Sequence, residues 1–318
     1  MPAARPVIPG STYHLTKRCV LRQFLLTPSE FVNELMAYCI AVAAERYGVR
    51  VHAACVMSNH QHQVVTDPLG ALPEYMHWID SQSAQCLNVY YDRSGPVWED
   101  VQYRRITLSG EIETDGVSDP LESDDDILEK MIYTVTNPVA AGLVGKSEQW
   151  PGLCVGPDRA AATQRIERPK RYFKSTPPTA DLNIVRPPCY QELSDEEFVD
   201  LVRGRTEERE SQIREERRAS GETFVGAKRV RKTCPTDSPK ASSRERSKPE
   251  VAGKDQKRRL ERKRRLIVWL ETYRRALEEF QTNRDVEFPP GTYYMKKRFG
   301  VRVAEFIRSS KDEPKPPD

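Results

Sequence analysis

Apolar and polar positions alternate along the first third of the chain in a way that predicts both strands and helices. Strands are indicated where β-branched and apolar residues lie between turn residues, at 13–17, 50–57 and 60–66. A helix is predicted over 27–48, because Thr-Pro-Ser-Glu opens it with Thr27 as N-cap and a glycine closes it. A second helical pattern spans 72–91, and residues 97–108 indicate extended chain.

The order of these elements is strand, helix, strand, strand, helix, strand, which is typical of a ferredoxin-like fold. We therefore predict an α+β domain with an antiparallel sheet and two helices on one face. The strands 50–57 and 60–66 form a hairpin within that sheet, joined by a turn at Ser58 and Asn59. The sheet face opposite the helices is then open to a substrate.

The pattern changes along the rest of the chain. A third helix is predicted at 127–136, capped by Ser123, and Pro138 either ends it or starts another turn. A charged helix is predicted at about 195–219, and a basic helix at 257–280. We expect four parts, namely a folded domain at 8–155, a charged extension at 156–227, a disordered basic linker at 228–255, and a C-terminal segment at 256–318 that contains the basic helix.

Composition agrees with a folded part followed by a polar part, since 31% of the residues are charged and 38% are hydrophobic. The net charge of +3 is small, so any contact with nucleic acid must come from local clusters of basic residues. The seven cysteines are scattered without a Cys-x-x-Cys pair, which favours reduced thiols over disulfides or structural zinc. The sequence shows neither a signal-peptide pattern nor a long apolar run, and we expect a cytoplasmic protein without a membrane span.

His60 and His62 are the first candidates for chemistry. They are two positions apart on a predicted strand, so their side chains point the same way and their imidazoles can converge on one divalent ion. Two histidines at this spacing are also common on the polar face of an ordinary strand. A third ligand is needed before a metal site is indicated.

Tyr133 and Asn137 supply the missing partners. They are four positions apart on the third predicted helix and therefore share one face. If that helix lies on the open face of the sheet, a phenol and a carboxamide approach the two histidines. Two imidazoles and one amide oxygen leave positions on Mg²⁺ or Mn²⁺ for phosphate oxygens and water. Asn137 precedes a proline, and a helix-end cap is the other interpretation of that residue.

Two segments, Asn-His-Gln-His at 59–62 and Tyr-Thr-Val-Thr-Asn-Pro-Val-Ala-Ala-Gly-Leu-Val at 133–144, carry a family resemblance. In this order and separation they resemble the HUH single-tyrosine transposases of the IS200-like superfamily, and in particular the REP-associated tyrosine transposase branch. The segments Tyr-His-Leu-Thr at 13–16 and Gly-Pro-Val-Trp at 95–98 are also similar to the family's equivalents. The resemblance covers about residues 8–155 and implies the HUH nuclease fold.

The resemblance implies cleavage and rejoining of single-stranded DNA that forms imperfect hairpins. Tyr133 is the expected nucleophile, which forms a 5′-phosphotyrosine link and releases a 3′-hydroxyl. The expected ligands of Mg²⁺ or Mn²⁺ are His60, His62 and Asn137. The expected partner is single-stranded or hairpin DNA, and the expected location is the cytoplasm, associated with the nucleoid. Whether the protein is a monomer or a homodimer stays open.

The chain departs from the family at two positions. Gln61 stands where the family usually has a bulky apolar residue, and its amide needs a partner because it points towards the helices. Val101 stands where the family often has an arginine, so either Arg104 and Arg105 take over its phosphate contact or that DNA contact is lost. The full set of expected DNA contacts is Arg104, Arg105, Trp98, Arg258, Arg262 and Arg265.

Two other functions stay open. The chain could be a regulator that binds hairpin DNA without cleaving it, or a metal-dependent phosphodiesterase in which water attacks instead of Tyr133. The remaining histidines, His14, His52 and His77, are predicted to be structural.

Overall fold

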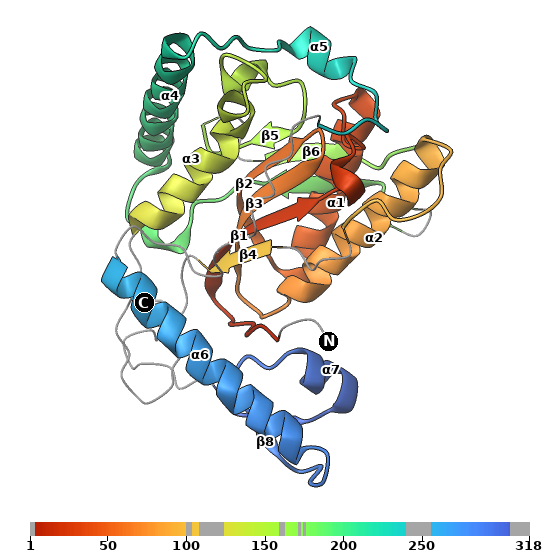
Figure 1. Ribbon diagram of the computed structural model, residues 1–318, viewed down its shortest axis with the longest axis vertical. Coiled ribbons are helices and arrows are strands. Elements are labelled where there is room, and N and C mark those ends of the chain that lie inside the picture. The colour runs from red at the N-terminus through yellow and green to blue at the C-terminus, as the bar shows by residue number, and fades with distance from the viewer. Residues whose placement is uncertain are drawn as a thin grey trace.

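The computed structural model describes residues 4–99, 104–107, 124–158, 163–170, 173, 176–239 and 256–305. The first elements are β1 (Ser11–Arg18), α1 (Glu30–Tyr47), β2 (Arg50–Met57), β3 (His60–Asp67), α2 (Leu72–Tyr90) and β4 (Arg104–Thr107). The sheet has the order β4-β1-β3-β2-β5, where β5 is the short strand Cys154–Val155. All its neighbouring strands are antiparallel. The predicted ferredoxin-like α+β order is therefore confirmed (Figure 1).

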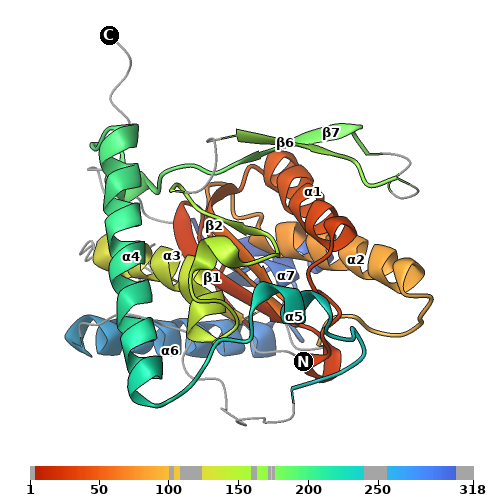
Figure 2. The ribbon, with the colours of Figure 1, turned by 90° about the horizontal axis from the view of Figure 1, so that it is seen from above.

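The helices α1 and α2 cover one face of the sheet (Figure 2). Alternate strand residues such as Tyr13, Leu15 and Val65 point into this layer and are fully buried with the apolar residues of both helices. Burying each such side chain contributes about 1.5–3 kcal/mol before the entropic cost of ordering the chain. This layer is the main hydrophobic core.

The other face of the sheet is covered by α3 (Asp124–Ala140), and α4 (Asp195–Ala219) packs on α3 (Figure 2). Ala53 and Val64 of the sheet share a cluster with the buried apolar residues of α3, and Phe198 and Val202 of α4 belong to the same cluster. We expected this face of the sheet to be open to a substrate. In the structure it is covered by the predicted third helix.

The start of α1 differs from the prediction, and the structure defines the end of α3, which the sequence left open. Ser29, not Thr27, is the N-cap of α1, and its hydroxyl accepts a hydrogen bond from the Val32 amide at 3.2 Å. Pro138 lies inside α3 and does not end it. The helix tolerates this proline because only its final residues follow, after which the chain turns through Gly142 at φ +70°.

The charged extension is built onto the domain. Its hairpin, β6 (Thr163–Glu167) and β7 (Thr179–Asn183), packs against α1, and Ala180 and Leu182 are buried in the main core. The predicted helix at 195–219 is confirmed as α4. Residue 155 therefore does not separate two independent cores.

The prediction of a disordered linker from residue 228 is wrong for its first part. The short helix α5 (Ala227–Arg231) begins there, and Val230 is buried beside Trp150 and Ile213. Farther on, the Asp237 carbonyl accepts a hydrogen bond from the Phe24 amide at 2.9 Å. A few apolar anchors and backbone bonds suffice to fix this polar segment, and residues 240–255 lie outside the described part.

A small C-terminal unit contains α6 (Gln256–Glu279), β8 (Glu287–Phe288), α7 (Tyr294–Phe299) and β9 (Arg302–Val303). It has a hydrophobic cluster of its own around Phe280 and Phe288. The Val7 amide donates to the Gly291 carbonyl at 2.9 Å, which ties this unit to the start of the chain. Among the described helices, none has a stretch long and apolar enough to cross a membrane.

Candidate active site

His60 and His62 lie on β3, the central strand of the sheet, on the face that carries α3. Their ring centroids are 4.8 Å apart and the rings are nearly perpendicular. His62 is buried, with 5% of its surface exposed. The two imidazoles lie next to each other, as their spacing on one strand predicts.

Hydrogen bonds determine which nitrogen of His60 faces the site. Asn59 Nδ2 donates to the Arg22 carbonyl at 3.1 Å, so the amide oxygen of Asn59 is the atom that meets His60 Nδ1, at 2.7 Å. An amide oxygen only accepts, so His60 Nδ1 must carry the proton. The Nε2 atom of His60 is then unprotonated and able to bind a cation.

Thr16 has the same relation to His62. Its Oγ1 lies 2.9 Å from His62 Nδ1 and can accept that nitrogen's proton, because a hydroxyl oxygen is both donor and acceptor. On the other side of the ring, His62 Nε2 lies 3.3 Å from Nδ2 of Asn137. In this tautomer Nε2 accepts from the Asn137 amide.

Both histidines are held in the neutral form. Burial, together with the positive charges of Arg18 and Arg22, lowers the pKa of His60 to about 4. Burial and the neighbouring His60 lower the pKa of His62 well below its usual range. Neutral imidazole is the form that binds metal ions, so neither ring needs to lose a proton near pH 7.

The helix α3 brings Tyr133 and Asn137 to this pair. Asn137 is buried beside the two histidines, and its Nδ2 lies 3.3 Å from His62 Nε2. The Tyr133 ring meets the His62 ring edge-on, with centroids 5.5 Å apart, and 45% of its surface is exposed. The four residues that the sequence proposed as a site are therefore adjacent in space.

His14, which the sequence analysis treated as structural, is part of this cluster. Its ring stacks on His62 with centroids 5.2 Å apart, and it meets the Tyr133 ring edge-on at 5.6 Å. In the pairing of β1 with β3, His14 is opposite Val64, so it lies on the same sheet face as His62. His52, in contrast, is structural, because its two nitrogens bond to the Val185 carbonyl and to Thr66.

Arg18 and Arg22 are a second feature that sequence reasoning missed. Arg18 pairs with His60 across the β1–β3 ladder, and Arg22 follows in the turn after β1. Both raise the positive potential at His60. No sequence motif connects these arginines with the histidines. Only the register of β1 against β3 shows that they lie beside His60.

Gln61 points to the opposite face, as expected, and joins a buried polar chain. Gln63 Nε2 donates to Gln61 Oε1 at 3.0 Å, and the Tyr75 hydroxyl donates to Gln63 Oε1 at 2.5 Å. The oxygen of Gln61 is thereby satisfied, whereas its Nε2 has no hydrogen-bond partner in the described part of the chain. Gln61 is thus accommodated in the core, on the sheet face opposite His60 and His62.

Trp98 does not meet the expectation of a DNA contact. Its side chain is buried in the main core, with 7% exposed, and its indole N–H donates to the Asp80 carbonyl at 3.0 Å. A ring that is enclosed on the α2 side of the sheet is unavailable for stacking on a base. The prediction for Trp98 is wrong because its polar end is satisfied inside the protein.

The other expected DNA contacts are only partly described. Arg104 and Arg105 occupy β4 opposite Thr16 and Leu15, but their side chains lie outside the described part. The Arg258 side chain also lies outside it. Arg265 pairs with Glu261 at 3.2 Å on α6, which packs on β8 in the C-terminal unit. Arg262 lies on the same helix.

The donor set fits a hard divalent cation. Two imidazole nitrogens and a carboxamide converge, and the carboxamide presents its oxygen after a half-turn about its last bond. Among the described residues, no cluster of three or more His, Cys, Asp or Glu side chains could hold a metal ion. Asn137 is therefore needed to complete a three-ligand site.

Comparison with known proteins gives a family match for one part of the chain. Residues 8–116, about a third of the chain, match the family model for IS200-like transposases. The search of curated proteins gave no match.

Two solved structures are similar over part of their length. A REP-associated tyrosine transposase bound to a REP hairpin has 17% identity and a TM-score of 0.37, over 46% of this chain and 78% of its own. A candidate transposase from Deinococcus radiodurans R1 has 20% identity and a TM-score of 0.27, over 34% of this chain and 87% of its own.

The site thus consists of a histidine pair on a ferredoxin-like sheet and a tyrosine on the helix that covers it. The similarity to the IS200-like transposase family model covers residues 8–116 and does not include Tyr133 or Asn137.

Proposed function

We propose that the protein cleaves and rejoins single-stranded DNA through a covalent 5′-phosphotyrosine at Tyr133. The observation that carries the proposal is the edge-on contact of the half-exposed Tyr133 ring with His62, one helical turn before Asn137. A phenol at this position is open to a substrate on one side and adjoins the candidate ligands on the other.

In the first step the Tyr133 hydroxyl oxygen attacks the scissile phosphorus. A bond forms between that oxygen and phosphorus, the bond from phosphorus to the 3′-oxygen breaks, and the tyrosine proton passes to solvent. The leaving 3′-oxygen takes up a proton and becomes a 3′-hydroxyl. In the second step another 3′-hydroxyl attacks the phosphotyrosine, which restores Tyr133 and joins the strands without ATP.

His60, His62 and Asn137 are the residues that would hold Mg²⁺ or Mn²⁺. A bound divalent cation supplies Lewis-acid chemistry, which neutralises the charge that develops on the phosphoryl group. Asn59 and Thr16 keep the two imidazoles in the tautomer that this role requires. Arg18 and Arg22 provide positive charge for the phosphate beside His60.

The substrate in this proposal is a strand that forms REP-like hairpins, and the protein acts as a monomer or a homodimer. One of the two similar structures is a REP-associated tyrosine transposase that is bound to a REP hairpin. Arg104, Arg105, Arg258, Arg262 and Arg265 remain proposed contacts to the DNA backbone. Such contacts are independent of base sequence and weaken with salt.

Incubation with end-labelled hairpin DNA and Mg²⁺ or Mn²⁺ tests the proposal. The wild-type chain should give an SDS-resistant protein–DNA adduct, and Tyr133→Phe should lose it while still binding DNA. Tyr47→Phe is a matched control that should form the adduct normally. Cleavage that survives Tyr133→Phe would point to a phosphodiesterase that uses water, and binding without cleavage would point to a regulator.

A further inference from the structure

A groove of about 520 Å³ lies between α3 and α4, and Tyr133 is part of its wall. Its α3 side also carries Asp125, Glu129 and Lys130, and the Lys130 ammonium lies 5.4 Å from the Tyr133 ring centre. Tyr133 therefore has two neighbourhoods, the histidine cluster on one side and this groove on the other. If a DNA phosphate reaches Tyr133, the neighbouring nucleotides of that DNA strand lie along the histidine cluster or in the groove.

The second wall belongs to the charged extension, outside the family match at 8–116. It consists of Arg205, Glu208, Arg209 and Gln212, which follow one another at helical spacing along one face of α4. Arg205 and Arg209 are one turn apart, so both side chains lie on the face of α4 that lines the groove.

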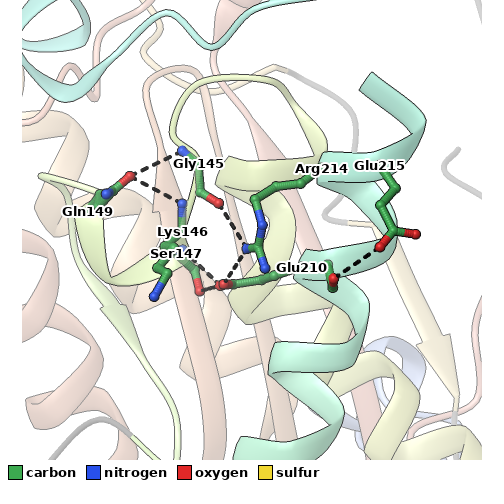
Figure 3. A network of polar contacts seen from close by, with 8 residues as sticks. Gly145, Lys146, Ser147, Gln149, Glu210, Arg214 and Glu215 are labelled. Carbon is green, nitrogen blue, oxygen red and sulfur yellow. Dashed lines mark hydrogen bonds and ion pairs between the residues drawn. The ribbon is translucent and has the colours of Figure 1, made fainter. Parts of the chain in front are cut away.

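The position of α4 is fixed by a buried polar anchor (Figure 3). Glu210 is buried, and its Oε1 accepts hydrogen bonds from the Ser147 amide at 2.8 Å and from the Ser147 hydroxyl. Arg214 donates to the Gly145 carbonyl at 3.2 Å and pairs with Glu210 Oε2 at 3.4 Å. Ser147 closely follows α3 in the sequence. These bonds therefore fix the position of α4 relative to α3, and with it the two walls of the groove.

The groove is lined by charges of both signs. Lys130, Arg205 and Arg209 are cationic, whereas the carboxylates suit the amino and ring N–H donors of unpaired bases. A single strand presents both phosphates and free base edges, and a duplex does not present its paired edges. The volume is that of a small-molecule pocket, which has room for a nucleotide but not for a double helix.

The arginines are available to such a ligand at little cost. Arg205 pairs with Glu208 at 3.5 Å with both side chains more than half exposed, and Arg209 donates to Gln212 at 3.4 Å. Exposed contacts of this kind contribute little to stability and exchange readily for a phosphate.

Building on the proposed function, we propose that the α3–α4 groove holds the single-stranded nucleotides next to the scissile phosphate. Arg205 and Arg209 contact their phosphate oxygens, and the Asp125 and Glu129 carboxylates of the α3 wall contact the bases. The charged extension is thereby a part of the substrate-binding site.

Two probes test this in EDTA by fluorescence anisotropy with the full chain: a hairpin oligonucleotide with single-stranded dT tails, and the same hairpin without tails. The double variant Arg205→Ala, Arg209→Ala should bind the tailed probe at least about tenfold more weakly and the tail-less probe normally. For the tailed probe, the slope of log K against log salt should shrink by about 0.7 for each lost contact. Glu208→Gln should tighten binding of the tailed probe, because it releases Arg205 and removes a negative charge.

Matched controls are Arg203→Ala with Arg218→Ala, and Glu216→Gln, all on α4 but outside the groove lining. These should leave both affinities unchanged. Equal losses for the two probes, equal losses in the controls, or no binding of the tailed probe by the wild-type chain would overturn the inference. A wild-type chain that binds through the arginines but forms no adduct refutes only the phosphotyrosine reaction. An adduct that forms while the arginine variants bind normally refutes only the groove.

Discussion

The Nδ1 atoms of His60 and His62 each have an oxygen partner, Asn59 and Thr16, which leaves both Nε2 atoms on the side of Asn137. Partners of this kind fix the tautomer and orientation of a metal-binding imidazole. In the proposed function, Asn59 and Thr16 would therefore orient the two ligands without binding the cation themselves.

Asn59→Ala should weaken Mn²⁺ binding by about 10–100-fold, because His60 loses the acceptor that holds its Nδ1 proton. Thr16→Val, which keeps the shape of the side chain, should have an effect in the same direction at His62. Isothermal titration calorimetry with Mn²⁺ measures both. Asn283→Ala, in the C-terminal unit, is the control, and unchanged Mn²⁺ affinity in Asn59→Ala and Thr16→Val would contradict this role.

The principal site residues could be predicted from the sequence because each pair is local. His60 and His62 share a strand face, and Tyr133 and Asn137 share a helix face, so simple spacing rules find them. His14 and Arg18 could not be found in this way. Their place beside His62 and His60 depends on the register of β1 against β3, which joins positions some 40 to 50 residues apart.

Between the elements β1 and α2, a charged pair is buried under the sheet. Lys17 Nζ lies 3.6 Å from Asp80 Oδ2, and both side chains are mostly buried. Burial raises the pKa of Asp80 to about 7, and Lys17 opposes this rise only in part. The folded chain therefore keeps a proton on Asp80 at pH values where the unfolded chain has lost it.

The free energy of unfolding should consequently depend on pH through Asp80. A raised folded-state pKa contributes stability that is present below the unfolded pKa of about 4 and is lost as the pH rises towards 7. The Asp80→Asn variant lacks this contribution, so its stability relative to the wild type should rise by up to a few kcal/mol across that range. Urea titrations at several pH values measure the difference, and a difference independent of pH would contradict the assignment.

The boundaries of the helices could be predicted more easily than the elements against which the helices pack. The capping box of α4 was visible, since Ser194 accepts from the Glu197 amide and Glu197 from the Ser194 amide. Its packing on α3 was not, because Phe198, Val202 and Ile213 are few apolar residues in a highly charged helix. The buried Glu210 gave no local signal of its partner Ser147.

For the whole molecule, the charged extension completes the fold. Phe198 and Val202 cover α3, and Ala180 and Leu182 fill the main core beside α1. The four-part division expected from composition missed this, because composition reports how polar a segment is and not where its few apolar residues pack.

A chain that ends after Val155 should therefore fail to fold cooperatively. It would expose the buried apolar face of α3 and leave part of the main core unfilled. Circular dichroism melting and size-exclusion chromatography should show a broad transition and aggregation. A chain that ends after residue 239 lacks only the separate cluster of the C-terminal unit, and should melt cooperatively. Normal melting of the shorter fragment would contradict this account.

The central claim is that Tyr133 becomes covalently linked to DNA, and peptide mass spectrometry of the adduct tests it most directly. After nuclease and trypsin digestion of the wild-type adduct, the peptide that contains Tyr133 should carry the mass of a 5′-nucleotide, and fragmentation should place it on the phenol. The cleaved partner strand should end in a 3′-hydroxyl. A nucleotide on any other residue, or cleavage that leaves every tyrosine unmodified, would contradict the account.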